Sequence, residues 1–473
     1  MVFNSITFLV FFAIVLLLHR LPLPWAWKKF NLMIGGYVFY AAWNPVFVVL
    51  LWIATLVDWF MALRIASAAT PARRKACLLV SLASNLGMLG FFKYGNFLLD
   101  NCIRLLGLAG IDFHPVKFDI VLPIGISFYT FQSLSYTIDV YRGKLRPCKS
   151  LLNFAFFISF FPMLVAGPIV RAVDFLPQCE KPRQANSRQL GWGLTLITLG
   201  LLMKVLLADA VLAPMADEVY GNAANAGCGY AWLGTLAFSG QIFYDFAGYS
   251  TCAIGAALCL GFALCDNFHS PYAAIGFSDF WRRWHISLSS WLRDYLYISL
   301  GGNRKGTLRT YANLMLTMLL GGLWHGANWR FVVWGALHGA YLGIERLFRS
   351  RLEGVAVTSR WYVQLPLALL TYALVCIAWV FFRAESFADA VALCGAMLRG
   401  GRNSLEPMGT ARVLKVVAIC AFLLVSHWMM RHTTLEQVWD RVPNWARSLA
   451  LAALLLCLAF APGDDRAFIY FQF

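Results

Sequence analysis

His325 is the residue whose type and setting most strongly suggest chemistry. It lies within the largely apolar run LMLTMLLGGLWHGANWRFVVW, residues 314–334. A titratable side chain at membrane depth finds little water to bind, so it marks a functional site more often than a packing position. A neutral imidazole, with an ordinary pKa of about 6.5, is well suited to take a proton from a hydroxyl group. We therefore predict that His325 is a catalytic general base.

The neighbours of His325 support this prediction. Trp324 and Asn328 flank it and are candidate site residues, and three glycines in the same block allow close helix approach or a helix break. The simpler alternative is a core histidine that only bonds to a neighbour. His338 follows thirteen residues later. On a continuous helix it lies roughly 20 Å away on a different face, so we do not expect it to share the site.

A second histidine lies in the aromatic segment DFWRRWHISLSSWLRDYLY, residues 279–297. On one continuous helix its apolar residues form a single stripe, with arginines on the other side, as in a helix at a membrane interface. That pattern does not account for His285, which falls at the stripe's edge, about 40° from Trp281. We predict that His285 belongs to the active site; a structural or interfacial hydrogen bond is the alternative. The stripe comprises Trp281, Trp284, Leu288, Trp291, Leu292 and Tyr295.

Two weaker candidates contain charged residues. The turn Gly301–Gly306 contains Arg304 and Lys305, which could bind a phosphate of a coenzyme A donor, although an ordinary basic turn is the commoner use of such a loop. Asp245 lies in the apolar run QIFYDFAGYS and is a candidate tunnel residue. Its alternative role is a structural ion pair.

The elements that must position these residues are membrane helices. The chain has 473 residues, of which 60% are hydrophobic and only 13% charged, and its mean hydropathy is +0.65. A soluble domain carries about 25% charged residues. We predict an all-α polytopic integral membrane protein with about ten to thirteen membrane segments, 151–170 among them. We expect a single domain over residues 1–473, with its catalytic core at about 240–340.

Charge and cysteine usage exclude other classes of function. The formal net charge of +16 comes from 39 Lys and Arg against 23 Asp and Glu. These basic residues cluster in short connections, as cytoplasmic loops of membrane proteins do, so no nucleic-acid partner is expected. The twelve cysteines form no C-x-x-C pair, so we predict neither a disulfide framework nor structural zinc. The histidine spacing predicts no metal site.

At these residues the chain resembles the membrane-bound O-acyltransferase (MBOAT) family. It is most similar to the bacterial branch of the alginate O-acetyltransferase membrane subunit and the teichoic acid D-alanyl transferase. Nearly the whole chain takes part in the resemblance, and the ending FIYFQF is also typical. The matching blocks are LPIGISFYTFQSLSYTIDVYRG (122–143), AGPIVR (166–171), FYDFAGYS (243–250), FWRRWHISLSSWLRDYLYISLGGNRKG (280–306) and MLLGGLWHGANWRFVVWGALHG (318–339).

The resemblance implies a multi-helix MBOAT fold around a buried tunnel, with His325 as the invariant family histidine and His285 as the second one. It implies transfer of an acetyl group from a cytoplasmic thioester, acetyl-coenzyme A or an acyl carrier, for O-acetylation of a secreted polysaccharide. A multi-pass protein of the inner membrane, a periplasmic esterase-like acetyltransferase partner and polysaccharide export machinery are expected with it. No bound cofactor is expected.

Several alternatives stay open from the sequence. Met163 stands where the alginate subunits carry a histidine, so another secreted glycan such as cellulose is as plausible as alginate. D-alanyl or other acyl transfer to a cell-envelope polymer is the alternative within the enzyme class. From a different class, a polytopic transporter would also combine many spans with intramembrane His and Asp residues. Such carriers usually show repeated halves, and no repeat is visible here.

Overall fold

Helices account for nearly all of the structure, and the described residues contain no β-strand. The computed structural model describes residues 1–473 except 117–118, 166, 353–359, 400–404, 406–407, 462–465 and 472–473, with the side chains of 349–352 and 471 also left out. Ala166 of the AGPIVR block and the last two residues of FIYFQF therefore lie outside the described residues.

Six helical stretches are long and apolar enough to cross a membrane, and two shorter apolar helices accompany them. This confirms a multi-pass, all-helical membrane protein. Among the other predicted segments, 151–170 is divided into α6 and α7, because Pro162 cannot donate a backbone hydrogen bond within a continuing helix. The six stretches are Pro45–Ser67, Pro71–Leu108, Ser187–Gly221, Cys228–Cys259, Trp361–Arg383 and Thr410–Met429.

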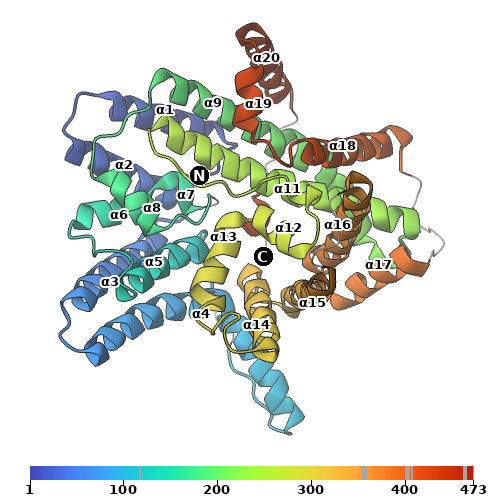
Figure 1. The fold of residues 1–473 in the computed structure, drawn as a ribbon, viewed down its shortest axis with the longest axis horizontal. Helices are drawn as coiled ribbons and strands as arrows, with labels where there is room; N and C mark the ends of the chain where they lie inside the picture. Colours follow the sequence, from blue (N-terminus) through green and yellow to red (C-terminus); the bar gives the residue numbers. More distant parts are fainter. Residues whose placement is uncertain are drawn as a thin grey trace. The chain divides into compact units, whose positions relative to one another are not determined.

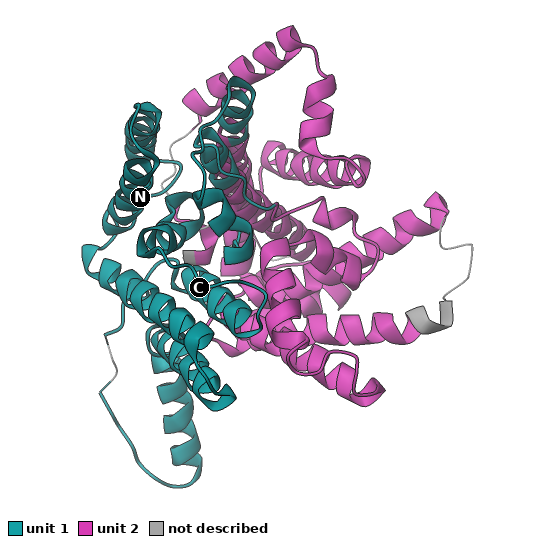
Figure 2. Cartoon of the chain, turned by 60° about the vertical axis from the view of Figure 1, so that its left-hand side comes forward, with its two compact units in different colours: residues 1–196, 253–265 teal, residues 197–252, 266–473 magenta. Residues whose placement is uncertain are grey.

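The chain forms two compact units, coloured separately in Figure 2. Unit 1 comprises Met1–Leu196 and Ala253–Cys265. Some of its helices begin at side-chain caps: Ser5, Thr70 and Ser150 each accept a backbone N–H at the start of a helix. Its elements are α1 (Ile6–Arg20), α2 (Trp25–Ala41), α3 (Val48–Ser67), α4 (Pro71–Leu108), α5 (Ile126–Tyr141), α6 (Leu151–Ser159), α7 (Phe161–Leu164), α8 (Ala172–Phe175) and most of α9 (Ser187–Leu201).

Unit 2 comprises Ile197–Cys252 and Asp266–Phe473 and contains all the predicted site residues. A π-helical stretch, η3 (Leu202–Leu212), follows α9, and a second, η6 (Leu292–Tyr297), follows α13. The remaining helices, all but α10 labelled in Figure 1, are α10 (Ala213–Gly221), α11 (Cys228–Cys259, which belongs to unit 1 from Ala253 on), α12 (Phe277–Arg283), α13 (Ile286–Trp291), α14 (Thr307–His325), α15 (Trp329–Leu352), α16 (Trp361–Arg383), α17 (Phe387–Arg399), α18 (Thr410–Met429), α19 (Leu435–Arg441) and α20 (Asn444–Ala459).

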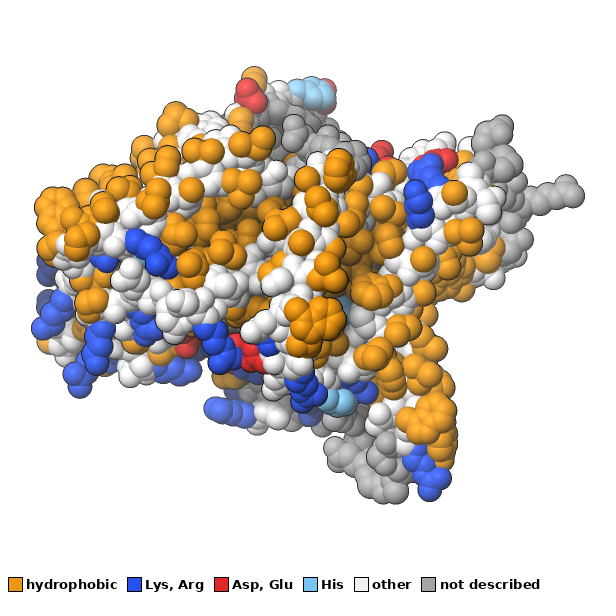
Figure 3. Space-filling model, turned by 90° about the horizontal axis from the view of Figure 1, so that it is seen from above, with side chains coloured by type: hydrophobic (Ala, Val, Ile, Leu, Met, Phe, Trp, Pro, Cys, Tyr) orange, Lys and Arg blue, Asp and Glu red, His pale blue; other side chains and the backbone are white. Residues whose placement is uncertain are grey.

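The surface suits a lipid environment. Hydrophobic side chains cover much of the face drawn in Figure 3. Large apolar side chains are exposed at many positions, including Ile6 (80%), Leu108 (87%) and Trp445 (72%). Exposed apolar area on this scale would be a liability in water, whereas hydrocarbon solvates it. All twelve cysteines are free.

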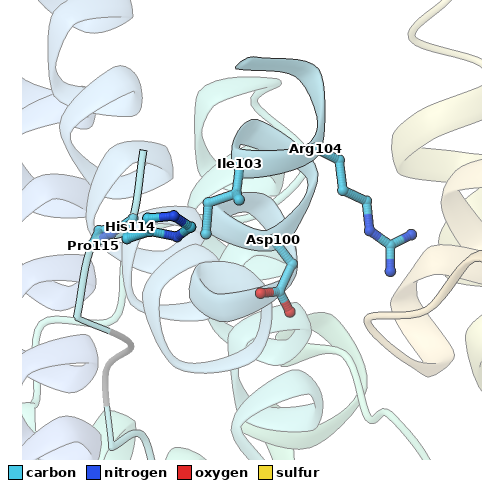
Figure 4. A pocket seen from close by; sticks show the side chains of 5 residues that line it. All are labelled: Asp100, Ile103, Arg104, His114 and Pro115. Atoms are coloured by element: carbon cyan, nitrogen blue, oxygen red, sulfur yellow. The ribbon is translucent and has the colours of Figure 1, made fainter. Parts of the chain in front are cut away.

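Unit 1 has a surface pocket near the end of α4. It is lined by Asp100, Ile103 and Arg104 of that helix and by His114 and Pro115 after it (Figure 4). All five residues belong to unit 1. None of the predicted site residues lines this pocket.

Candidate active site

The two predicted histidines meet around one indole ring. His325 is the last residue of α14 and is only 3% exposed, and His285 is fully buried. The ring of Trp324 lies 5.0 Å from that of His325 and 6.0 Å from that of His285, centre to centre, with edge-on geometry in both pairs. The structure therefore brings together three of the residues predicted from the sequence.

Two further aromatic residues complete a circuit with these three. The ring of Phe246 lies 4.6 Å from that of His285, and the ring of Tyr470 lies 5.5 Å from that of His325. The rings of Phe246 and Tyr470 are themselves 4.5 Å apart. We call His285, Trp324, His325, Tyr470 and Phe246 the aromatic circuit. It combines imidazoles that can exchange protons with an apolar wall that excludes water.

Glycines allow His325 to reach this position. A Cβ atom on Gly322 would lie 2.2 Å from the carbonyl oxygen of Phe331, and one on Gly326 would lie 2.1 Å from its ring. Only hydrogen fits at these two points, so α14 and α15 pack with their backbones in close contact. The turn between them therefore holds His325 at the end of a rigid helix pair.

The segment around His285 differs from the single helix that its sequence pattern predicts. The helix breaks between α12 and α13, where Trp284 is extended and His285 adopts a left-handed conformation with φ of 42° and ψ of 56°. The cause lies in a neighbouring loop: Ile286 N–H donates to the Asn267 carbonyl and His269 N–H to the Arg283 carbonyl, in place of helical bonds. The predicted stripe is nevertheless buried on both sides of the break, apart from the partly exposed Trp281.

The Asn267 side chain holds the imidazole of His285. Its Oδ1 lies 3.0 Å from His285 Nδ1 and also accepts the Ser287 hydroxyl at 2.9 Å. Its Nδ2 donates to Ser250 Oγ at 3.0 Å. Burial lowers the pKa of His285 to about 3, because a charged imidazolium would lose its hydration. The ring is therefore neutral at physiological pH.

Asp245 belongs to a buried ion-pair cluster next to the aromatic circuit. Lys204 Nζ contacts Asp245 Oδ1 at 2.6 Å and Asp209 Oδ1 at 2.9 Å, and all three side chains are 2–3% exposed. Lys204 and Asp209 both lie in the π-helix η3. The i→i+5 bonding of a π-helix places residues five apart above one another, which an α-helix does not do. The alternative of a structural ion pair for Asp245 is thus supported.

The same cluster fixes the C-terminal segment. Ile469 N–H donates to Asp245 Oδ2 at 2.7 Å, and Lys204 Nζ donates to the Ala467 carbonyl at 3.4 Å. Arg466 pairs with Asp217. These residues line a polar pocket with Gln241, Arg383 and Glu385. Because Tyr470 follows Ile469, the cluster sets the position of the tyrosine ring against His325.

The structure does not bring the other predicted residues to the aromatic circuit. Asn328 is exposed, and its Oδ1 accepts the N–H and Nε of Arg330 at the start of α15. Arg304 and Lys305 are exposed in a turn between η6 and α14, whose Gly302 carbonyl accepts Asn313 Nδ2. Their role in donor binding stays a prediction.

Sequence reasoning did not identify Asn267, Lys204, Phe246 or Tyr470 as site residues. Phe246 lies beside Asp245 in a block already singled out, and Tyr470 lies in the aromatic ending. Asn267 lies in an irregular loop without periodicity, and Lys204 in an apolar run that a π-helix distorts. Lys204 is a charge within an apolar run, a signal that could have marked it, whereas no local signal marks Asn267, whose side-chain partners lie 17 to 20 residues away.

Comparisons with known proteins agree on one family over most of the chain. The family model described as "MBOAT, membrane-bound O-acyltransferase family" matches residues 148–388. The chain is 39% identical to the "Probable alginate O-acetylase AlgI" of Pseudomonas putida, over 100% of both proteins. It is 35% identical to the "Peptidoglycan O-acetyltransferase" of Helicobacter pylori, covering 94% of this chain and 91% of that one. It is 26% identical to the "Teichoic acid D-alanyltransferase" of Bacillus subtilis, covering 58% and 72%.

Proposed function

Because the chain belongs to the membrane-bound O-acyltransferase family, we propose that it transfers an acetyl group from a thioester donor to a hydroxyl for O-acetylation of a secreted, alginate-type polysaccharide. The observation that carries this proposal is the aromatic circuit, in which two buried histidines share Trp324. The identity to a probable alginate O-acetylase over the whole chain supports the acceptor class.

In the proposed reaction, His325 takes the proton of the acceptor hydroxyl while the oxygen attacks the thioester carbonyl. The C–S bond breaks, the ester forms, and the proton passes to the leaving thiolate, so the base is regenerated. A positioned base of this kind contributes roughly 10²–10⁴-fold in rate. Alignment of the two substrates in a water-poor chamber supplies much of the remainder.

The proposed donor is acetyl-coenzyme A or an acyl-thioester carrier in the cytoplasm. Arg304 and Lys305 are exposed and basic, so they are suited to a donor phosphate or an acidic carrier surface. The proposed location is the inner membrane, where such a donor and an exported polymer can approach from opposite sides. A periplasmic esterase-like acetyltransferase and the export machinery are the proposed partners.

Other acceptors and other acyl groups are the alternatives within the same enzyme class. The peptidoglycan O-acetyltransferase relative keeps peptidoglycan open as the acceptor. D-alanyl transfer has weaker support, because the D-alanyltransferase relative matches a smaller part of the chain at lower identity. A transporter has no support among the relatives named above.

The test is the acetyl content of the extracellular polymer and of peptidoglycan in cells that carry His325→Ala. We expect acetylation of the polymer to fall at least 100-fold at matched protein level in the membrane, because the general base is lost. His432→Ala is the matched control, since His432 is exposed and distant from the circuit in sequence.

Each outcome separates the alternatives. Loss of acetyl groups with unchanged polymer yield supports acetyl transfer to that polymer. Loss confined to peptidoglycan identifies peptidoglycan as the acceptor. Normal acetylation in His325→Ala contradicts the catalytic assignment, and loss of the polymer itself favours an export function.

A further inference from the structure

We propose that Asn267 is a positioning residue that fixes His285 in the tautomer with its proton on Nδ1, so that Nε2 accepts a hydrogen bond from a second hydroxyl of the acceptor, beside the one that reacts, and does not donate one to the oxyanion. This inference rests on the proposed function, because it assigns a task to His285 within the same reaction.

The first step is the orientation of the Asn267 amide. The atom that faces Nδ1 of His285 also accepts the Ser287 backbone N–H, at 3.4 Å, and the Ser287 hydroxyl, at 2.9 Å. A backbone N–H can only donate, so this atom is the amide oxygen. On the other side, Asn267 Nδ2 donates to Ser250 Oγ at 3.0 Å, which agrees with the same orientation.

The second step is the location of the imidazole proton. An amide oxygen can only accept, and it lies 3.0 Å from His285 Nδ1. Nδ1 must therefore carry the hydrogen, which leaves the lone pair of a neutral ring on Nε2. Because burial lowers the pKa of His285 to about 3, the ring does not acquire a second proton at neutral pH.

The third step is rigidity. Asn267, Ser287, Ser250 and His285 are all at most 4% exposed. The backbone of Asn267 is bonded as well, since its carbonyl accepts the Ile286 N–H at 2.9 Å. Side chain and backbone together prevent the amide rotation that would offer Nδ2 to the histidine. An asparagine held less firmly could select the wrong tautomer.

The chemical consequence is that His285 and His325 have different roles. A neutral imidazole with its lone pair on Nε2 attracts an O–H group and repels an oxyanion. A carboxylate in place of Asn267 would hold the same tautomer but would also stabilise the imidazolium. The neutral amide supplies orientation alone. His285 therefore holds the acceptor through a neighbouring hydroxyl, while His325 removes the proton of the hydroxyl that reacts.

The experiment compares Asn267→Asp and Asn267→Ala with wild type, using membranes from polymer-producing cells supplied with labelled acetyl-coenzyme A. The rate of acetyl incorporation into polymer is measured against pH and donor concentration. Asn222→Asp is the control, because Asn222 is exposed and bonds only to the Glu218 carbonyl through its side chain. His325→Ala is assayed in parallel to test the proposed function separately.

We expect Asn267→Ala to lower kcat by roughly 10–100-fold with little change in KM for the donor, by analogy with the hydrogen-bond partners of metal-ligating histidines. In Asn267→Asp the carboxylate raises the pKa of His285. A protonated Nε2 cannot accept a hydrogen bond from the acceptor. The fall in rate on the acid side of the pH–rate profile therefore moves to higher pH. Asn222→Asp leaves the profile unchanged.

A structural role for Asn267 would lower the amount of folded protein in both variants and leave the pH profile of the remaining activity in place. An unshifted acid limb in Asn267→Asp would therefore overturn the proposal, as would wild-type kcat in Asn267→Ala. If Asn267→Ala does not fold, the isosteric Asn267→Asp decides alone. Normal activity in His325→Ala refutes the proposed function, whatever the Asn267 variants do.

Discussion

At the residue scale, the setting of His325 limits what its imidazole can contact. Its ring lies against those of Trp324, Trp334, Phe382 and Tyr470, at centre-to-centre distances of 4.9–5.5 Å. Such a wall lowers the local dielectric and strengthens each polar interaction that a bound substrate makes. The type of this residue could be predicted from its depth in an apolar run. Its neighbours could not, because three helices and the C-terminal segment supply them.

Gly326 allows a residue-scale test of this packing. In Gly326→Ala the new methyl group meets the buried ring of Phe331, since the Cβ position lies 2.1 Å from it. Overpacking of this kind costs about 1–3 kcal/mol. We expect a lower thermal unfolding midpoint in detergent, together with reduced acetylation.

Gly395→Ala is the matched control for that substitution. No atom lies within 4 Å of a Cβ built at Gly395 in α17, so this change leaves stability unchanged or raises it by about 0.4–1 kcal/mol through the unfolded chain. Equal unfolding midpoints for the two variants would contradict the close contact between Gly326 and Phe331.

At the scale of elements, irregular stretches position the chemistry. The break between α12 and α13 turns His285 toward Trp324, and the π-helix η3 places Lys204 beside Asp209 and Asp245. Hydrophobic periodicity predicted 279–297 as one regular helix, and it correctly predicted the buried side of that segment. It could not predict the break, because the competing hydrogen bonds come from the loop at 267–269.

Asp245→Asn tests the ion-pair cluster that holds the C-terminal segment. The change removes a buried charge that Lys204 contacts at 2.6 Å. Because Lys204 keeps Asp209 as a partner, the loss is that of a charge-assisted hydrogen bond, about 1.5–3 kcal/mol. We expect a large fall in unfolding free energy by chemical denaturation, and a loss of acetylation that exceeds the loss of folded protein, because Tyr470 is displaced from His325.

A partly exposed ion pair provides the comparison. Glu218 pairs with Arg412, and the two side chains are 36% and 39% exposed. Pairs of this kind contribute about 0–1 kcal/mol, so Glu218→Gln changes stability little. If both substitutions had equally small effects, the cluster around Asp245 would not anchor the segment.

At the scale of the whole molecule, composition was the most reliable guide. A chain with 60% hydrophobic and 13% charged residues has few solutions other than a bundle of membrane helices. The location of the C-terminal aromatic residues could not be predicted, because Tyr470 and Phe246 meet across more than two hundred residues of chain. Contacts of that separation leave no periodic signal in the sequence. A single domain over the whole chain stays a prediction.

The proposed donor-binding turn, Gly301–Gly306, lies at the protein surface. The double substitution Arg304→Gln/Lys305→Gln removes two exposed positive charges. Both residues lie far in sequence from the ion-pair cluster of Lys204, Asp209 and Asp245. If this turn binds a donor phosphate, KM for acetyl-coenzyme A rises several-fold, kcat is unchanged, and the effect shrinks at high salt because screening already weakens the wild-type contact.

The exposed Arg441 in α19 serves as the charge control for that variant. Arg441→Gln leaves KM for acetyl-coenzyme A unchanged. Should the double variant behave in the same way, the turn takes no part in donor binding and only connects η6 with α14.

The left-handed backbone of His285 has a consequence for how this position can evolve. At a φ of 42°, the backbone of most residues is strained. Glycine adopts this conformation freely, and asparagine, aspartate and histidine adopt it more readily than other residues. The conformational demand is independent of the imidazole chemistry. In descendants that abandon this chemistry, we expect glycine or asparagine to replace the histidine, and not alanine or valine. The left-handed bend would then be retained although the activity is lost.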